Sequence, residues 1–390
     1  MISEAEARIK ILEAVTPSAP RKMAILEALD RFAAEDYFAR LPLPMFDNSA
    51  MDGYAVSSQD CKRGARLRVA GEQPAGVDRR LRVSNGNTIR IFTGAPIPIG
   101  ADSVVMQEDV TRDGDEIVVN TDVEAGDFVR TRGCDLGEGQ KILSAGERIT
   151  VATAALMASQ GFSEISVGGE VRAAIISTGD ELAKPGAKLE PGQIYDSNSI
   201  LLQALLARAG AKVSASEKCN DNADSLRKAF RAGAKNDIVI VTGGVSVGEH
   251  DLVQQTLREL GAKIDIWRVA IKPGKPFLFG KLDQALVFGL PGNPVSAFVT
   301  FLQFVRPAIL KMTGAANRDL QKVPARLGGE LSNDSERAHY FRGKLEDGTF
   351  GPIGRQESHA LFGLSQSNAL LRLDPGENLK SGDLVEVEIW

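Results

Sequence analysis

DIVIVTGGVSVGEHDLVQQTLREL (residues 237–260) decides the fold class, because it joins an apolar run to a glycine-rich loop and then to a helical pattern. Residues 237–243 are rich in β-branched side chains, which is typical of a strand buried on both faces. Residues 250–261 carry apolar side chains at helical spacing. The same order of strand, loop and helix repeats on both sides of this stretch. The sequence therefore predicts a parallel sheet covered by helices on both faces.

The surrounding sequence extends this pattern to residues 169–317, which we assign to a central doubly wound α/β domain. Further apolar or β-branched runs predict strands at 171–177, 211–217, 264–270 and 285–290. Periodic runs predict helices at 199–210, 223–233 and from near Asn293 onward. In sheets of this kind, ligands bind beyond the carboxyl ends of the strands.

The rest of the chain predicts three further parts. Residues 41–140 read as an inserted small β domain, because short extended runs alternate there with turns. Residues 1–40 and 141–168 read as a helical linker domain, with three-residue apolar spacing in the first segment and a helix at 150–161. Residues 318–390 return to β patterns and predict a C-terminal β domain.

Composition excludes several classes of protein. The chain has 390 residues, enough for about two to four domains, and its formal net charge is −5, which disfavours a basic nucleic-acid face. Its three cysteines are odd in number and lie far apart, which suits a reducing cytoplasm. We find no apolar run of the roughly 18 residues that a membrane helix needs. The expectation is a cytoplasmic protein without nucleic-acid or membrane partners.

Four unusual loops follow the predicted strands of the α/β domain. They are STGDEL (177–182), GGVSVGEHD (243–251), IKPGKPF (271–277) and PGNPVS (291–296). Glycines let backbone amides approach a ligand, and helix N-termini favour anions. Lys272 and Lys275 add positive charge. One such loop could be an ordinary turn, but four at one sheet edge predict a site for a phosphorylated or oxyanionic ligand.

Three acids, Glu181, Asp221 and Asp251, are expected at the same edge. A hard cation such as Mg²⁺ binds a few carboxylates together with phosphate oxygens. The alternative for Asp180 and Asp251 is that each caps a helix N-terminus. Both interpretations stay open from spacing alone.

Residues 244–248 also fit G-x-S-x-G, the nucleophile elbow of α/β-hydrolases. An elbow serine follows its strand directly, whereas several residues separate Ser246 from the predicted strand. A loose glycine-rich loop forms an anion-binding nest more easily than a strained elbow. The catalytic histidine would have to be His339 or His359, both in another domain. A serine hydrolase is therefore the weaker alternative.

Taken together, the long motifs resemble the MoeA family of molybdopterin molybdenumtransferases, with the gephyrin E domain as a eukaryotic relative. The resemblance spans nearly the whole chain. Its motifs are FDNSAMDGYAV (46–56), TGAPIPIGAD (93–102), STGDEL (177–182), DSNS (196–199), TGGVSVGEHD (242–251), IKPGKPFLFG (271–280), GLPGNPVSAF (289–298), ERAHYFR (336–342), SHALFGLSQSNAL (358–370) and GDLVEVEIW (382–390).

The resemblance implies an enzyme that binds molybdate, inserts the metal into adenylylated molybdopterin and releases AMP with Mg²⁺. The catalytic residues it implies are Asp52, Thr93, Glu181, Asp221, Asp251, Lys272 and Lys275. Substrate binding is expected at Gly243, Gly244, Ser246, Arg268, Pro291, Asn293 and Pro294. Molybdate is expected at Arg337, Arg342 and Ser358. The Mg²⁺ ligands would be drawn from Glu181, Asp221 and Asp251.

The family also implies an elongated homodimer, in which the β insert of one subunit covers the α/β domain of the other. A molybdopterin adenylyltransferase would be a further partner. Two positions depart from the family pattern: Arg268 stands where lysine is frequent, and Glu357 stands where glycine is common. Because gephyrin also clusters receptors, a non-catalytic scaffold is the main alternative. The joint presence of Asp52, Glu181, Asp251 and Lys272 favours the enzyme.

Overall fold

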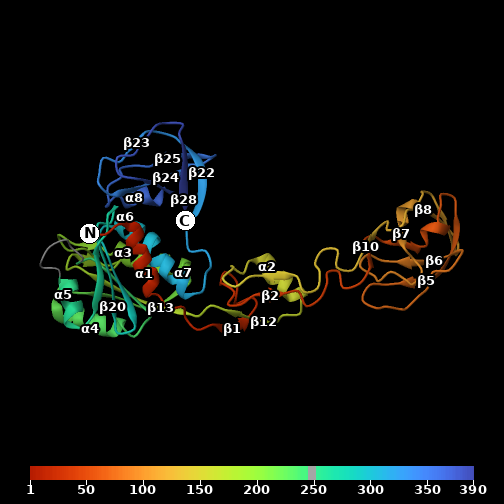
Figure 1. The fold of residues 1–390 in the computed structure, drawn as a ribbon, viewed down its shortest axis with the longest axis horizontal. Helices are drawn as coiled ribbons and strands as arrows, with labels where there is room; N and C mark the ends of the chain where they lie inside the picture. The colour runs from red at the N-terminus through yellow and green to blue at the C-terminus, as the bar shows by residue number, and fades with distance from the viewer. Residues whose placement is uncertain (245–251) are drawn as a thin grey trace. The chain divides into compact units, whose positions relative to one another are not determined.

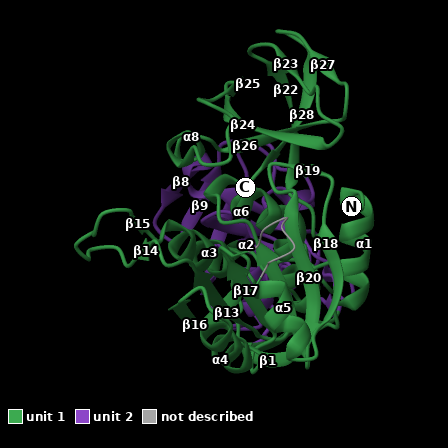
Figure 2. Cartoon of the chain, turned by 90° about the vertical axis from the view of Figure 1, so that its left-hand side faces the viewer, with its two compact units in different colours: residues 1–35, 145–151, 164–390 green, residues 36–144, 152–163 purple. Residues whose placement is uncertain are grey.

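The protein is described by a computed structural model that covers residues 1–244 and 252–390. Its elements are shown in Figure 1. The chain separates into two compact units, coloured in Figure 2. Unit 1 contains residues 1–35, 145–151 and 164–390, and unit 2 contains residues 36–144 and 152–163. The boundaries of the four predicted domains stay a prediction.

The centre of unit 1 is a six-stranded sheet. Across the sheet, its strands are β16 (Ala211–Cys219), β13 (Val171–Thr178), β17 (Ile238–Thr242), β21 (Ala285–Leu290), β20 (Pro276–Leu282) and β18 (Lys263–Arg268). The first four are parallel, with Ile175 opposite Ile240 and Ile240 opposite Phe288. All five strands predicted for this domain are present.

The prediction of a wholly parallel sheet is wrong at one edge. β20 is an additional strand that runs antiparallel to both β21 and β18. The sequence analysis placed its first two residues, Pro276 and Phe277, in the IKPGKPF loop and predicted no element for the rest of the strand. Since β18 and β21 are each antiparallel to β20, they run in the same direction. The loop that follows β18 therefore still begins at the carboxyl edge of the parallel strands.

Helices cover both faces of this sheet. Successive side chains of a strand point to opposite faces, so each strand contributes to two separate buried clusters. Ile175, Ile240 and Phe288 belong to a buried cluster that includes residues of α3 (Ser197–Arg208) and α6 (Pro294–Thr300). Their strand neighbours Ile176 and Val287 belong to a second cluster, which includes residues of α4 (Ala223–Gly233) and α5 (Leu252–Glu259). Helices therefore pack against both faces of this mixed sheet.

One helical run is more apolar than the sequence analysis expected. α6 continues through a π-helical segment (Phe301–Val305) into α7 (Arg306–Met312). The whole run, Pro294–Met312, is 19 residues long, and its mean hydropathy reaches 1.3. By length and composition it could cross a membrane, so the expectation of no such run is wrong. Of that window, 89% is buried inside the protein, which is typical of a core helix.

The N-terminal segment is mostly not helical, which corrects the helical linker prediction. Only α1 (Glu4–Ala14) is a helix, with Ser3 as its N-cap. β1 (Arg21–Ala24) instead pairs antiparallel with β12 (Glu164–Val167). Pro17 and Pro20 cannot continue a helix, and the three-residue apolar spacing beyond them falls on this strand and the following turns.

The C-terminal part of unit 1 forms a closed ring of five strands, because β24 pairs with both β25 and β26. In ring order these are β24 (Ala338–Glu346), β25 (Thr349–Pro352), β22 (Gln321–Leu327), β28 (Leu384–Ile389) and β26 (Ala369–Leu373). A short strand that follows β18, β19 (Ile271–Lys272), also pairs with β24. This pairing joins the KPGKP motif to the C-terminal domain. The shorter elements of unit 1 are β14 (Leu182–Ala183), β15 (Ile194–Tyr195), β23 (Leu331–Ser332), α8 (Leu361–Ser365) and β27 (Asn378–Leu379).

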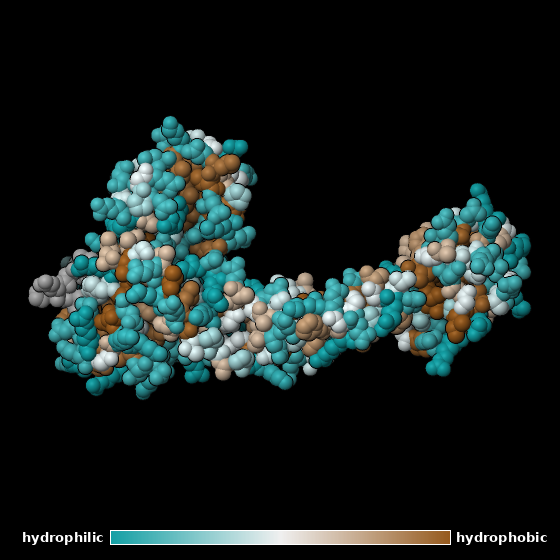
Figure 3. Space-filling model, viewed as in Figure 1, coloured by the Kyte–Doolittle hydropathy of each residue, from teal (hydrophilic) through white to brown (hydrophobic). Residues whose placement is uncertain are grey.

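Unit 2 contains a second six-stranded sheet, in accord with the predicted β insert. Across this sheet lie β7 (Ser103–Met106), β4 (Gly53–Val56), β6 (Asn87–Ile91), β5 (Arg66–Gln73), β9 (Glu116–Val119) and β8 (Val110–Asp113). Two small pairings and one helix complete the unit: β2 (Tyr37–Phe38) with β11 (Lys141–Leu143), β3 (Asn48–Ser49) with β10 (Val129–Arg130), and α2 (Val151–Ser159). Hydrophilic residues predominate on the visible surface of both units (Figure 3).

Candidate functional site

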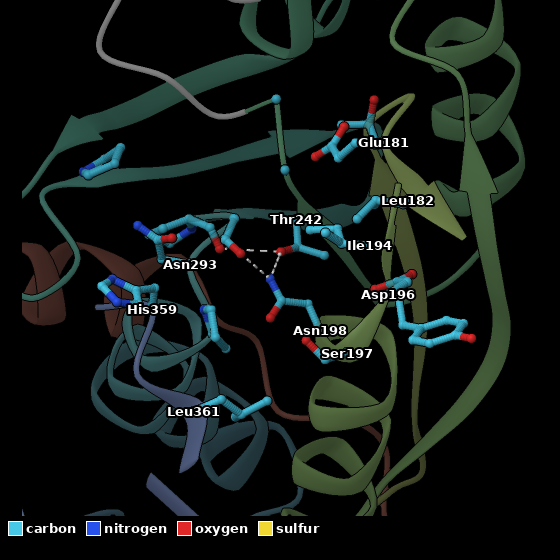
Figure 4. Close-up of a pocket in the computed structure, with 18 residues that line it drawn as sticks. Glu181, Leu182, Ile194, Asp196, Ser197, Asn198, Thr242, Asn293, His359 and Leu361 are labelled. Carbon is cyan, nitrogen blue, oxygen red and sulfur yellow. Dashed lines mark hydrogen bonds between the residues drawn. The ribbon is translucent and has the colours of Figure 1, made fainter. Parts of the chain in front are cut away.

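A cavity of about 690 Å³ lies beyond the carboxyl ends of β13, β17 and β21 (Figure 4). This volume lies within the range of small-molecule sites, about 300–1,000 Å³. Thr178, Thr242 and Pro291, at or just after the ends of these strands, all line it. Six residues predicted from the loops line it as well: Glu181, Gly243, Gly244, Pro291, Asn293 and Pro294.

Asn198 ties the wall of this cavity together. Its side-chain nitrogen donates to Thr242 Oγ1 at 3.0 Å and to the Gly292 carbonyl at 2.7 Å (Figure 4). Because the carbonyl can only accept, the amide orientation is fixed. The side chain is 8% exposed, so these bonds are shielded from water. The sequence analysis did not select Asn198, although it noted the DSNS motif; a polar residue in the first turn of a helix that follows a loop was the available signal.

The position directly after β17, residue 243, requires a glycine. Its φ is +81°, and a Cβ there would lie 2.1 Å from the Thr178 carbonyl oxygen. Any other residue would therefore clash with the neighbouring strand end. This close approach keeps the loops after β13 and β17 together at the cavity.

The carboxylates at this edge are partly brought together. Glu181 lines the cavity, and Asp221 accepts a hydrogen bond from Thr178 Oγ1 at 3.3 Å. The backbone of Asp221 in turn donates to Asp180 Oδ1 at 3.3 Å, so Asp180 holds the Asp221 loop. Within residues 1–244 and 252–390, no three His, Cys, Asp or Glu side chains form a group that could hold a metal. Ser246 and Asp251, which were predicted for this site, lie outside the described residues.

The two predicted lysines lie beside the cavity rather than on its wall. Lys272 is half-buried in β19, opposite His339 of β24, and Lys275 is exposed. Neither is a lining residue, whereas Pro276, which follows Lys275, is. Arg268 is half-buried at the end of β18. The structure therefore brings Lys272 to the C-terminal domain instead of into the cavity.

His339 was not predicted as a site residue, and it is the most unusual group near Lys272. It is 5% exposed, its ring contacts that of Phe341 at a tilt of 39°, and neither ring nitrogen has a hydrogen-bond partner in the described part of the chain. Burial lowers the pKa of His339 to about 4, and the charges of Lys272 and Arg337 act in the same direction. The imidazole is therefore neutral at pH 7.

The three residues predicted to bind molybdate, Arg337, Arg342 and Ser358, have different hydrogen-bond partners. Ser358 reaches the main site, because its hydroxyl accepts from Asn293 Nδ2 at 2.9 Å and its carbonyl accepts from the Val295 amide at 3.1 Å. Arg342 is 2% exposed and donates to the Arg355 carbonyl. Arg337 donates to the Ile271 carbonyl at 3.1 Å, next to Lys272. His359 and Leu361, which follow Ser358 in the sequence, line the cavity from the C-terminal domain.

In unit 2, Asp52 and Thr93 form a tight pair. The backbone amide and the hydroxyl of Thr93 donate to Asp52 Oδ1 at 2.7 and 2.8 Å. These two bonds, the amide bond first, lower the pKa of Asp52, and the charge of Arg90 adds to the effect. Both residues are exposed, so the carboxylate is held by hydrogen bonds but open to a ligand.

Three models of known protein families match consecutive regions of this chain. The MoeA N-terminal region (domain I and II) matches residues 2–161, the "Probable molybdopterin binding domain" matches residues 174–311, and the MoeA C-terminal region (domain IV) matches residues 324–390. The molybdopterin molybdenumtransferase of Haemophilus influenzae is 36% identical, and the match covers 100% of this chain and 98% of the relative. That of Nostoc sp. is 38% identical over 90% of this chain and 84% of the relative.

The solved structures agree. A crystal structure of the molybdopterin biosynthesis MoeA protein from Pyrococcus horikoshii matches with a TM-score of 0.86 at 30% identity, and the match covers 100% of both chains. Three family regions in order, whole-chain relatives above 30% identity and a whole-chain structural match are mutually consistent. The chain therefore belongs to the MoeA family of molybdopterin molybdenumtransferases.

Proposed function

We propose that this protein inserts molybdenum into molybdopterin, with the adenylylated form of molybdopterin as substrate and AMP as a product. The observation that carries the proposal is the cavity at the carboxyl edge of the central sheet. It combines a carboxylate, Glu181, with the glycine loop at Gly243 and the helix N-terminus that follows Asn293. Backbone amides and a helix N-terminus suit phosphate groups.

We further propose Mg²⁺ as the cation of the reaction. The oxygen donors of Glu181 and Asp221 have the chemistry that Mg²⁺ requires, and a Cβ built on the cavity residue Gly244 lies 3.6 Å from Asp221 Oδ1. Phosphate oxygens and water normally complete the shell of such a cation. When bound, the cation would neutralise charge on the phosphates, while Asn293 and the Gly243 loop orient the substrate.

Molybdate is proposed to bind near Ser358, where a hydroxyl is fixed against Asn293. Arg342 and Arg337 belong to the same proposal, as positive charges of the C-terminal domain. A homodimer, an adenylyltransferase partner and a cytoplasmic location complete the proposed function; the family resemblance supports the first two, and the three widely spaced cysteines support the third. A non-catalytic scaffold and a serine hydrolase remain less favoured, because the family relatives found here are named as transferases.

The test is a reconstituted reaction. Purified protein is mixed with adenylylated molybdopterin, molybdate and Mg²⁺, and both AMP release and metal incorporation are measured. We expect both products to require Mg²⁺ and to fall at least tenfold in Glu181→Gln, with folding checked by circular dichroism. Binding of adenylylated molybdopterin without AMP release, under conditions in which the Haemophilus relative is active, would favour the scaffold. Loss of activity on serine-directed phosphonate labelling would favour the hydrolase.

A further inference from the structure

A second cavity, of about 470 Å³, lies on unit 1 among α3, the π-helical segment with the start of α7, and the strands β22 and β28. We call it the arginine cavity, because Arg148, Arg208 and Arg306 all line it. None of its other lining residues has an acidic side chain. It shares no lining residue with the candidate site described above.

Arg306 is the central group of this cavity. Its side chain is half-buried, and one guanidinium nitrogen donates to the Arg318 carbonyl at 3.0 Å. Burial, followed by the nearby charges of Arg148 and Arg8, lowers the pKa of Arg306. The group nevertheless stays charged at pH 7, because an arginine side chain does not lose its proton in proteins. A partly buried positive charge is thus held against other positive charges.

Two nearby carboxylates, Asp319 and Glu388, raise the pKa of Arg306, but burial and the neighbouring arginines outweigh them. Asp319 pairs with Arg8, and Asp30, which is largely exposed, lies 3.5 Å from Arg148. Glu388 accepts a hydrogen bond from Gln303 at 2.7 Å. Among the described residues, no carboxylate lies within ion-pair distance of Arg306 or Arg208. Arg148 therefore has a paired carboxylate, whereas Arg208 and Arg306 have none in the described part of the chain.

The cavity also has room for a ligand beside these charges. A larger neighbouring cavity, of about 720 Å³, shares Arg148, Arg306, Leu320 and Gln321 with it, and the acidic residues Glu147 and Asp319 also line that neighbouring cavity. The opposite wall is apolar and includes Phe301, Leu302 and Trp390. Planar guanidinium groups bind tetrahedral oxyanions through paired hydrogen bonds. Arg208 and Arg306, two guanidinium groups without a paired carboxylate in the described part of the chain, line the same cavity and can bind such an anion.

We infer that the arginine cavity is an anion site that binds a phosphate group, separate from the site at which molybdopterin is proposed to react. Arg306 contacts the anion from the floor of the cavity, and Arg148 and Arg208 contact it from the rim. The apolar wall accommodates the organic part of the ligand where the phosphate is carried by a small molecule. This inference does not depend on the proposed transferase activity.

The test measures the binding of inorganic phosphate by isothermal titration calorimetry to the whole protein. Wild type is compared with Arg306→Met, which keeps an unbranched side chain without the charge, and with Arg208→Met, which changes an exposed residue and is expected to leave the fold intact. We expect each substitution to weaken binding about tenfold or more, since charge-assisted hydrogen bonds are lost. Phosphate should also raise the melting temperature of wild type but not of Arg306→Met.

Two control variants distinguish phosphate binding in the arginine cavity from phosphate binding elsewhere on the protein. Arg231→Met removes an exposed arginine of α4 and should leave phosphate binding unchanged. Lys272→Ala alters the candidate functional site and should also retain it. No binding at 10 mM phosphate, or equal loss in Lys272→Ala and none in Arg208→Met, would overturn the inference. Phenyl phosphate serves as a second probe: tighter binding that is lost in Trp390→Ala supports an organic phosphate, and equal binding of both probes supports a free oxyanion.

Discussion

Thr93 holds one carboxylate oxygen of Asp52 from two directions, with its backbone amide at 2.7 Å and its hydroxyl at 2.8 Å. Both donors stabilise the charged form of the acid, which is why the pKa of Asp52 lies below its ordinary value. Only the backbone bond is independent of residue type. A hydroxyl-bearing residue at 93 is therefore required for the second bond.

Thr93→Val should raise the pKa of Asp52, because it removes the hydroxyl and keeps the amide. Carbon-detected NMR titration of the Asp52 carboxyl measures this directly. Any stability that the ionised acid contributes is present above its unfolded pKa and is lost as pH falls through the lower folded value. Thr93→Ser is the matched control and should retain the wild-type value. An unchanged titration in Thr93→Val would mean that the hydroxyl bond is absent in solution.

Gly243→Ala should destabilise the protein much more than Gly210→Ala. Both glycines have a positive φ, +81° and +89°, so both substitutions carry a strain of about 1 kcal/mol. Only Gly243 approaches backbone, since its Cβ would lie 2.1 Å from the Thr178 carbonyl oxygen, whereas nothing lies within 4 Å at Gly210. Urea denaturation of the two variants gives the difference in unfolding free energy. Equal losses would show that the loop adjusts without cost.

Asn198→Leu should cost about 1–3 kcal/mol of stability, because it leaves the Gly292 carbonyl and Thr242 without their donor in a shielded position. Ser197→Ala, at the exposed neighbouring position, is the control and should change stability by less than about 0.5 kcal/mol. Chemical denaturation compares the two. If Asn198→Leu is as stable as wild type, the amide is not the link between α3 and the PGNP loop.

His339→Leu should make the protein less sensitive to acid. The pKa of His339 is about 4 in the folded chain, below its ordinary value of 6.5, so the unfolded chain binds more protons between these pH values. Stability therefore falls as pH decreases from 6.5 to 4, by up to about 3 kcal/mol. Leucine cannot titrate, and the variant should lack this part of the pH dependence. The unfolding free energy of both proteins is measured by urea denaturation between pH 4 and 7. If it falls equally steeply with decreasing pH in wild type and in His339→Leu, the prediction is wrong.

The parallel strands could be predicted from the sequence because both of their faces are buried. In β17, all five residues are buried, so the run IVIVT is apolar regardless of which way each side chain points. β20 is just as apolar, but the KPGKP motif before it is rich in turn-forming residues and concealed where the strand begins. Its antiparallel direction depends on tertiary pairing with β21, which no local pattern encodes.

The site residues also fall into those that the local sequence predicts and those that only long-range contacts identify. Glu181 and Asn293 follow strands directly, and their place at the cavity could be inferred from the rule that loops meet at the carboxyl edge. Asn198 could not be inferred, because its importance comes from partners 44 and 94 residues away in the chain. His339 was missed for a related reason: only the pairing of β19 with β24 brings it to Lys272. Long-range contacts, rather than local spacing, identify both residues.

The last prediction concerns the proposed homodimer. The family resemblance implies that Asp52 of one subunit serves the site that contains Glu181 of the other. Asp52→Ala and Glu181→Ala should each be inactive as homodimers. A mixed dimer would then have one site with both lesions and one with neither. Random exchange yields about half mixed dimers, so roughly a quarter of wild-type sites should recover, by the closed symmetry of a two-fold dimer.

The measurement is AMP release after the two inactive proteins are mixed and subunit exchange is verified by mass spectrometry of isotopically labelled chains. Glu181→Ala mixed with Asp52→Ala,Glu181→Ala is the control, because no combination of these chains contains an intact site. Its activity should stay at background. If the first mixture also stays at background while exchange is complete, each site takes both residues from a single chain. The shared-site part of the proposal would then be wrong, and the transferase activity itself would be unaffected.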